Sequence, residues 1–111
     1  MPKIAITDPQ HADLIRDAIR FFQGRADPAG TDPMWAELLG CVGERDMIID
    51  IPYEAGLIEH GLITLAWQRR QDGDDGVADL ADEYADRISR AFGREVYRRP
   101  LGYPWPKRPL D

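Results

Sequence analysis

The stretch VADLADEYADRISRAF, residues Val77–Phe92, carries the clearest helix pattern in the chain. Its apolar side chains recur at the i, i+3, i+4, i+7 spacing of one helix face, and they are Val77, Leu80, Ala81, Tyr84, Ile88, Ala91 and Phe92. The pattern predicts an amphipathic helix that begins at an Asp75 N-cap, ends at Gly93 and buries one face. Acidic residues come first and arginines follow, which suits the helix dipole. Two pairs four residues apart, Glu83–Arg87 and Asp86–Arg90, are expected to form ion pairs.

Three more helices are predicted upstream of this stretch. Asp-Pro pairs at residues 8–9 and 32–33 begin the first two, because Asp is a favoured N-cap and Pro suits the first helical position. The first helix is expected to end at Gly24, and Gly40 shortens the second. The third spans residues 50–70 and is apolar around most of its circumference, which predicts a central place in a bundle or an oligomer interface.

Two short apolar runs complete the body of the chain. Residues 3–7 alternate weakly between apolar and polar, and residues 47–51 are apolar apart from one Asp. The two runs could pair as strands, or the second could lead into the third helix, since periodicity does not decide for so few residues. We therefore predict a mainly α, small four-helix domain over residues 1–93, with at most a two-stranded β element.

Residues 94–111 differ from the rest of the chain. They hold four of its nine prolines, a density that prevents helix formation and favours an extended, polyproline-like course. The C-terminal end of the chain also has the opposite net charge to the rest. Residues 1–85 carry 7 basic and 17 acidic side chains, whereas residues 86–111 carry 7 basic and 3 acidic ones. The net charge of -6 is therefore the sum of a strongly acidic helical body and a basic C-terminal end.

This tail holds the residues that we predict to bind a partner. An extended proline-rich segment loses little conformational entropy on binding, and Trp, Tyr and Arg are frequent anchors of interfaces. The tail could dock on another protein, fold back over its own acidic body, or lie on the body of a second copy. Folding back is favoured for residues 94–103 and docking for residues 104–111. The candidate partner-binding residues are Arg98, Arg99, Tyr103, Trp105, Lys107 and Arg108.

Carboxylates on the last predicted helix raise a different possibility. Four of them stand at the i, i+3, i+4, i+7 spacing of one face, namely Asp79, Asp82, Glu83 and Asp86. This spacing resembles the Mg²⁺-binding faces of all-helical nucleotide pyrophosphohydrolases, and the resemblance implies a metal-dependent hydrolase. Such a site needs a second carboxylate helix, yet only Asp13 and Asp17 form a comparable pair, and the double-glutamate motif is missing. We therefore expect a solvated face paired with arginines, and no metal site.

Other reactive side chains are few. Cys41 is the one cysteine, which excludes an internal disulfide and a cysteine-rich zinc site and favours a reducing compartment. Ser89 is the one serine, and it lies within the last predicted helix rather than in a Gly-x-Ser-x-Gly turn. His11 and His60 have no spacing that requires a metal or a proton-transfer site. The sequence therefore indicates no catalytic, cofactor-binding or metal-binding residue.

Charge and hydropathy argue against several classes of binding partner. A net charge of -6 and a pI of about 4.8 argue against nonspecific binding to nucleic acid or anionic membranes. No stretch has the pattern of a signal peptide or a membrane span. We expect a cytoplasmic, non-catalytic interaction subunit of a bacterium or phage, an assembly, adaptor or inhibitory protein that docks through its tail and self-associates into a homo-oligomer. The alternative is a small transcriptional or DNA-processing regulator that contacts nucleic acid through its basic C-terminal end, and a Mg²⁺-dependent nucleotide hydrolase comes third.

Overall fold

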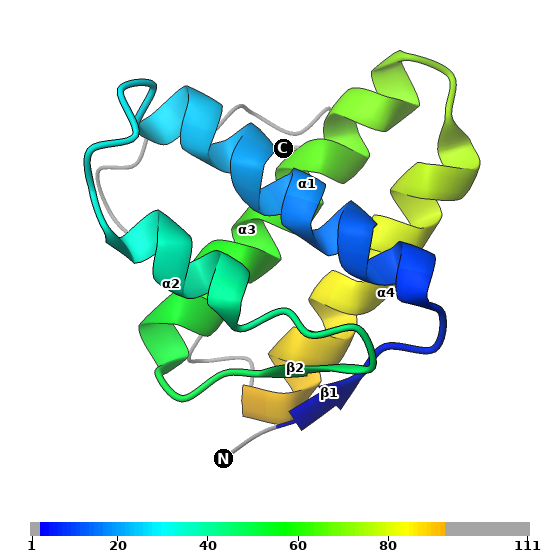
Figure 1. The fold of residues 1–111 in the computed structure, drawn as a ribbon. Helices are drawn as coiled ribbons and strands as arrows, with labels where there is room; N and C mark the ends of the chain where they lie inside the picture. Colours follow the sequence, from blue (N-terminus) through cyan, green and yellow to red (C-terminus); the bar gives the residue numbers. More distant parts are fainter. Residues whose placement is uncertain (1–2, 93–111) are drawn as a thin grey trace.

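The computed structural model describes residues 3–92, which form four helices and two short strands (Figure 1). In chain order these are β1 (Lys3–Ala5), α1 (Pro9–Ala26), α2 (Met34–Gly40), β2 (Asp46–Ile48), α3 (Pro52–Gln71) and α4 (Asp75–Phe92). The prediction of a mainly helical domain with a two-stranded β element is confirmed. The predicted tail, residues 94–111, lies outside the described residues. Within residues 3–92, the structure contains no helix with the length and hydropathy of a transmembrane segment.

Helix α3 is the central element. It packs along α4 and is crossed by α1, which passes in front of it in Figure 1. Its buried apolar side chains lie on several sides of the helix, and they are Ala55, Leu57, Ile58, Leu62, Leu65 and Ala66. Gly61 permits the close crossing with α1, because a Cβ at this position would lie 2.9 Å from the Ala18 carbonyl oxygen. The central place predicted for this helix is confirmed.

Helix α4 packs on the body with mostly small side chains. Its buried residues are Ala78, Ala81, Tyr84, Ala85, Ile88 and Ser89. The predicted stripe is therefore partly wrong, since Ala91 is exposed and Val77 is only half-buried. The N-cap is also displaced by one residue. The Asp74 carboxylate accepts from the Val77 N–H at 3.4 Å, and Asp75 is the first residue of the helix. The alanines on the buried face let the axes of α3 and α4 approach closely.

Helix α1 begins as predicted but ends later. Asp8 is the N-cap, and its carboxylate accepts from the Gln10 N–H at 2.9 Å. The predicted end at Gly24 is wrong, because the helix continues to Ala26. One glycine inside a helix costs only about 1 kcal/mol, which the packing of the buried face outweighs. In α2, Trp35 is buried against this helix, and its indole N–H donates to the Asp27 carboxylate at 2.9 Å.

The two short strands pair antiparallel, which settles the alternative that the sequence left open. Lys3 lies opposite Ile48, Ile4 opposite Met47, and Ala5 opposite Asp46. The strand covers residues 46–48, and residues 49–51 lead from it into α3. Met47 and Ile4 point into the core, and Ile48 points outward. The sheet therefore presents an apolar side chain to the surface beside the start of α3.

Candidate interaction surface

None of the predicted partner-binding residues falls within the part of the chain that the structure describes. Arg98, Arg99, Tyr103, Trp105, Lys107 and Arg108 all lie in the C-terminal segment beyond it. The body is described, however, and it holds the other candidates that the sequence raised.

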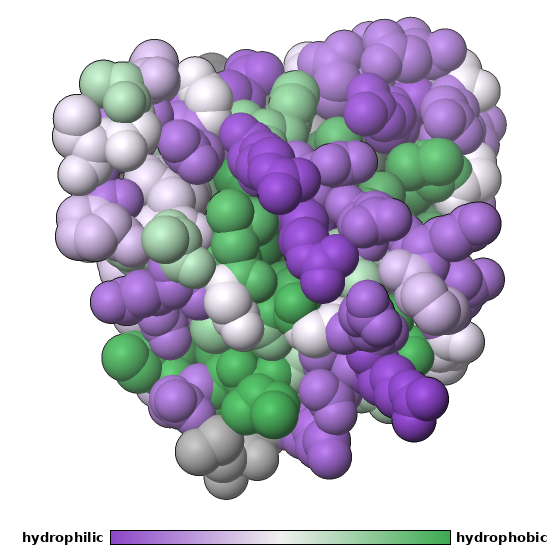
Figure 2. All heavy atoms as spheres, in the orientation of Figure 1, coloured by the Kyte–Doolittle hydropathy of each residue, from purple (hydrophilic) through white to green (hydrophobic). Residues whose placement is uncertain are grey.

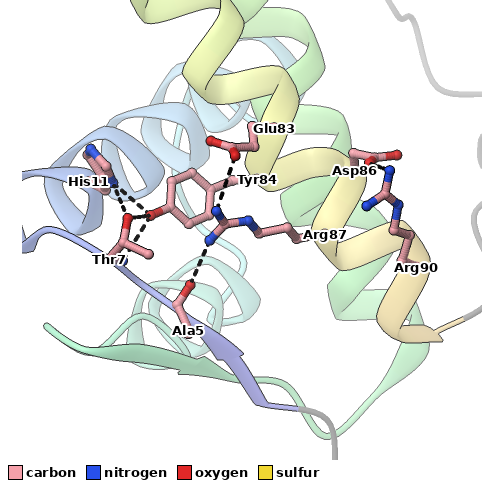
Figure 3. Close-up of polar contacts among 8 residues, drawn as sticks. All are labelled: Ala5, Thr7, His11, Glu83, Tyr84, Asp86, Arg87 and Arg90. Atoms are coloured by element: carbon pink, nitrogen blue, oxygen red, sulfur yellow. Dashed lines mark hydrogen bonds and ion pairs between the residues drawn. The ribbon is translucent and has the colours of Figure 1, made fainter.

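The acidic face of α4 is neutralised by arginines. Arg70, near the end of α3, lies 2.9 Å from Asp79 and 2.7 Å from Asp82. Within α4, the predicted pairs Glu83–Arg87 and Asp86–Arg90 form at 3.2 Å and 2.7 Å (Figure 3). The expectation of a solvated face paired with arginines is confirmed. This acidic face also weighs against α4 as a recognition helix for DNA.

The remaining candidates for a metal or catalytic site do not come together. Asp13 and Asp17 of α1 pair with arginines on their own helix, at 3.1 Å and 3.6 Å. No group of three or more His, Cys, Asp or Glu side chains within residues 3–92 is arranged to hold a metal ion. His60 is buried on α3, Cys41 is half-buried after α2, and His11 lies in the first turn of α1.

His11 belongs to a hydrogen-bonded cluster around Tyr84, shown in Figure 3. The buried Tyr84 hydroxyl accepts from the Thr7 N–H at 3.2 Å and forms a 2.7 Å hydrogen bond with His11 Nδ1. Arg87 lies over the Tyr84 ring, with its guanidinium carbon 4.9 Å from the ring centroid, and donates to the Ala5 carbonyl oxygen at 3.3 Å. These contacts join α4 to β1 and to the start of α1, so this cluster holds the fold together.

Exposed apolar side chains gather where β2 passes into α3. Among residues 3–92, the large hydrophobic side chains with substantial exposure are Ile48 at 45%, Ile51 at 51% and Tyr53 at 52%. They stand within six residues of one another along the chain. Figure 2 shows apolar surface at the lower left, over the β2–α3 junction of Figure 1. Scattered exposed apolar residues need no explanation, whereas a contiguous group marks a contact surface.

Ile51 occupies a position where a polar residue would stabilise the fold better. It is the N-cap of α3, has extended backbone, and gives the helix no side-chain hydrogen bond. Ser, Thr, Asp or Asn at an N-cap stabilises a helix by about 1 kcal/mol. Glu54 already stands three residues later, where it would complete a capping box with Ser or Thr. An exposed isoleucine here therefore lowers local stability, which is typical of residues that serve binding.

Three carboxylates beside these side chains have no cationic partner within residues 3–92, namely those of Glu37, Asp50 and Glu54. Burial, the charges of Glu37 and Asp50, and a hydrogen bond to Glu37 raise the pKa of Glu54 above its ordinary 4.5. Burial and the same three carboxylates raise the pKa of Cys41 to about 11, so its thiol stays protonated at neutral pH. We define the β2–α3 surface as the exposed residues Glu37, Ile48, Asp50, Ile51 and Tyr53, together with the adjacent buried carboxyl of Glu54.

The β2–α3 surface was not predicted from the sequence. Residues 47–51 were interpreted as a strand or as a buried lead-in to the third helix, and neither interpretation predicts that Ile48 and Ile51 are both exposed. The usable signal lies in residues 51–54, where Pro at the first helical position and Glu at the third indicate a helix start behind an apolar N-cap. Comparisons of the chain with protein-family models, curated proteins and solved structures find no match.

Proposed function

We propose that this protein is a non-catalytic interaction subunit that meets other protein molecules, including further copies of itself, through its C-terminal tail and its β2–α3 surface. The observation that carries the proposal is the placement of Ile51. An exposed isoleucine stands at a helix N-cap, between two other exposed apolar side chains and beside three carboxylates that have no cationic partner within residues 3–92. A polar N-cap would stabilise α3 better, so the exposed isoleucine supports a role in binding.

Apolar side chains and charged side chains have different roles in the proposed contact between the tail and the β2–α3 surface. Apolar and aromatic side chains supply most of the affinity when they become buried at the centre of an interface. Charges at the rim set the orientation and the rate of encounter. The body contributes an acidic, apolar surface, and the tail contributes Arg98, Arg99, Tyr103, Trp105, Lys107 and Arg108. The same proposal assigns the protein to a bacterial or phage cytoplasm as an assembly, adaptor or inhibitory component.

The mass in solution tests this function. We expect the mass of the full-length protein to rise with concentration between about 5 and about 500 µM, because short segments bury little area and bind weakly. A full-length tail variant, Trp105→Ala with Lys107→Ala and Arg108→Ala, should remain folded and monomeric over the same range. Sedimentation of both proteins provides the masses, and circular dichroism provides the folded state.

Two outcomes would contradict the proposed function. If the full-length protein stays monomeric at every concentration, the protein does not self-associate, and that part of the proposed function is wrong. A tail variant that associates as strongly as the unaltered protein would show that the predicted tail residues take no part in the contact.

A further inference from the structure

We infer that the β2–α3 surface of one molecule receives residues 104–111 of a second copy of this chain. The inference rests on the proposed function and deepens it, because it names the surface that the tail binds. Residues 104–111 read Pro-Trp-Pro-Lys-Arg-Pro-Leu-Asp and include three of the six predicted partner-binding residues. The surface they meet comes from β2, from the first turn of α3 and from Glu37 of α2.

The chemistry of the two partners is complementary. On the receiving side, Ile48, Ile51 and Tyr53 are about half exposed and adjacent in the chain. Trp105 supplies a large aromatic group of the kind that anchors interfaces, and flanking prolines restrict its backbone before binding. Apolar contact of this kind buries surface that the body alone leaves in water.

The charges agree with the same pairing. Glu37, Asp50 and Glu54 stand together without a lysine or arginine partner in residues 3–92. Burial first, and then repulsion from the other two carboxylates, raises the pKa of Glu54. Lys107 and Arg108 are adjacent cations in the tail. A cation held beside the three carboxylates removes this repulsion and orients the tail along the surface.

The same charges exclude a symmetric contact between two β2–α3 surfaces. A two-fold interface places the same patch on both sides, so it would bring six carboxylates together without a counter-charge from the described residues. A contact between the surface of one copy and the tail of the next avoids that repulsion. Such a contact closes into a dimer when two copies exchange their tails reciprocally, and it otherwise repeats from molecule to molecule in rings or open chains.

The length of chain between the body and residues 104–111 allows these residues to reach a second copy. Helix α4 packs against β1, and Lys3 of β1 lies opposite Ile48 of β2, so α4 is connected through β1 to the strand that carries part of the β2–α3 surface (Figure 1). A polyproline-like course rises about 3.1 Å per residue, so the twelve steps from Phe92 to Pro104 span roughly 37 Å. The longest dimension of the structure is 33 Å. A tail with the polyproline-like course that its prolines favour is therefore long enough to bring residues 104–111 to a neighbouring molecule.

A mixing experiment with two full-length variants tests this inference. The surface variant carries Ile51→Ser and Tyr53→Ser, and the tail variant carries Trp105→Ala, Lys107→Ala and Arg108→Ala. Each lacks one side of the contact, so each alone should be monomeric where the unaltered protein associates. An equimolar mixture combines one intact tail with one intact surface, so it should form a 1:1 dimer and no larger species. A control variant with Asp79→Ser and Glu83→Ser on α4 should associate like the unaltered protein.

The single substitution Ile51→Ser tests the surface in a variant that is expected to stay folded. Serine is a favoured N-cap residue, so the variant should retain its helix and should bind the tail about tenfold more weakly. A surface variant that associates as the unaltered protein does would overturn the inference and remove the β2–α3 surface from the proposed function, but it would leave the role of the tail in that function intact. A mixture that stays monomeric, while the unaltered protein associates and both variants remain folded, would also overturn it.

Discussion

The face of α4 and the β2–α3 surface are both acidic, but their carboxylates stand in opposite situations. On α4, Asp79 and Asp82 lie within 3 Å of Arg70, and the two carboxylates that follow each bind an arginine one turn later. On the β2–α3 surface, Glu37, Asp50 and Glu54 face one another without a cation from residues 3–92. The number of acidic residues is similar in the two regions, so composition does not separate them.

The difference lies in which charges the fold satisfies by itself. The arginines of α4 form ion pairs with its carboxylates. Arg87 also donates a hydrogen bond to the Ala5 carbonyl oxygen of β1 and lies over the Tyr84 ring. On the β2–α3 surface, no cation from residues 3–92 pairs with the carboxylates, and the surface also has exposed apolar side chains and a helix N-cap without a side-chain hydrogen bond. Substitutions on α4 should therefore change stability, and substitutions on the β2–α3 surface should change association.

The largest expected effect is a loss of association on charge reversal at the β2–α3 surface. Glu37→Lys with Asp50→Lys replaces attraction for Lys107 and Arg108 by repulsion, and we expect association to weaken by about tenfold or more. The matched variant on α4, Asp79→Lys with Glu83→Lys, should associate normally and lose up to about 1 kcal/mol of unfolding free energy. Sedimentation and urea unfolding of both variants would separate the two effects. Equal loss of association in both would abolish the distinction between the two regions.

Removing one hydroxyl should destabilise the α4 side without changing association. Tyr84→Phe keeps the aromatic ring beneath Arg87 but leaves the Thr7 N–H and His11 Nδ1 without their partner. We expect the free energy of unfolding to fall by about 1–2 kcal/mol. Thermal or urea unfolding measures this change, and an unchanged midpoint would show that the Tyr84 cluster does not hold α4 to β1 and α1.

A smaller, pH-dependent effect is expected at Glu54. Folding raises the pKa of this carboxyl, so its protonated form is favoured in the folded state and stability is lost as pH rises through the folded pKa. Glu54→Gln removes the charge and should increase the free energy of unfolding at pH 7, by about 1 kcal/mol or less. The gain should vanish below the ordinary pKa of 4.5, where the carboxyl is protonated in both states. Urea unfolding across this pH range measures it, and a variant less stable at pH 7 would contradict the crowding of carboxylates.

Local patterns predicted the elements whose burial is periodic. The apolar circumference of α3 and the amphipathic pattern of Val77–Phe92 identified both helices, and the i, i+4 spacing identified two ion pairs. The cluster around Tyr84 could not be predicted in this way, because His11 stands 73 residues away in the chain. Only packing brings these two side chains together.

The β2–α3 surface was missed for a related reason. A run of apolar residues normally predicts burial, and β2 and the residues that follow it bury Met47 and Ile49 but expose Ile48 and Ile51. The alternation begins in β2 and is interrupted where the chain turns into α3. The exposure of Ile51 therefore depends on where the helix starts, which the sequence locates through Pro52 and Glu54 rather than through hydropathy.

The most direct test of the account is a set of ¹H–¹⁵N spectra of the full-length protein recorded across the range of concentration over which it associates. If the β2–α3 surface is the contact, the amide signals of residues 48–54 should shift with concentration, and those of residues 79–90 should stay in place. Shifts confined to residues 79–90, or association with no change at residues 48–54, would contradict it.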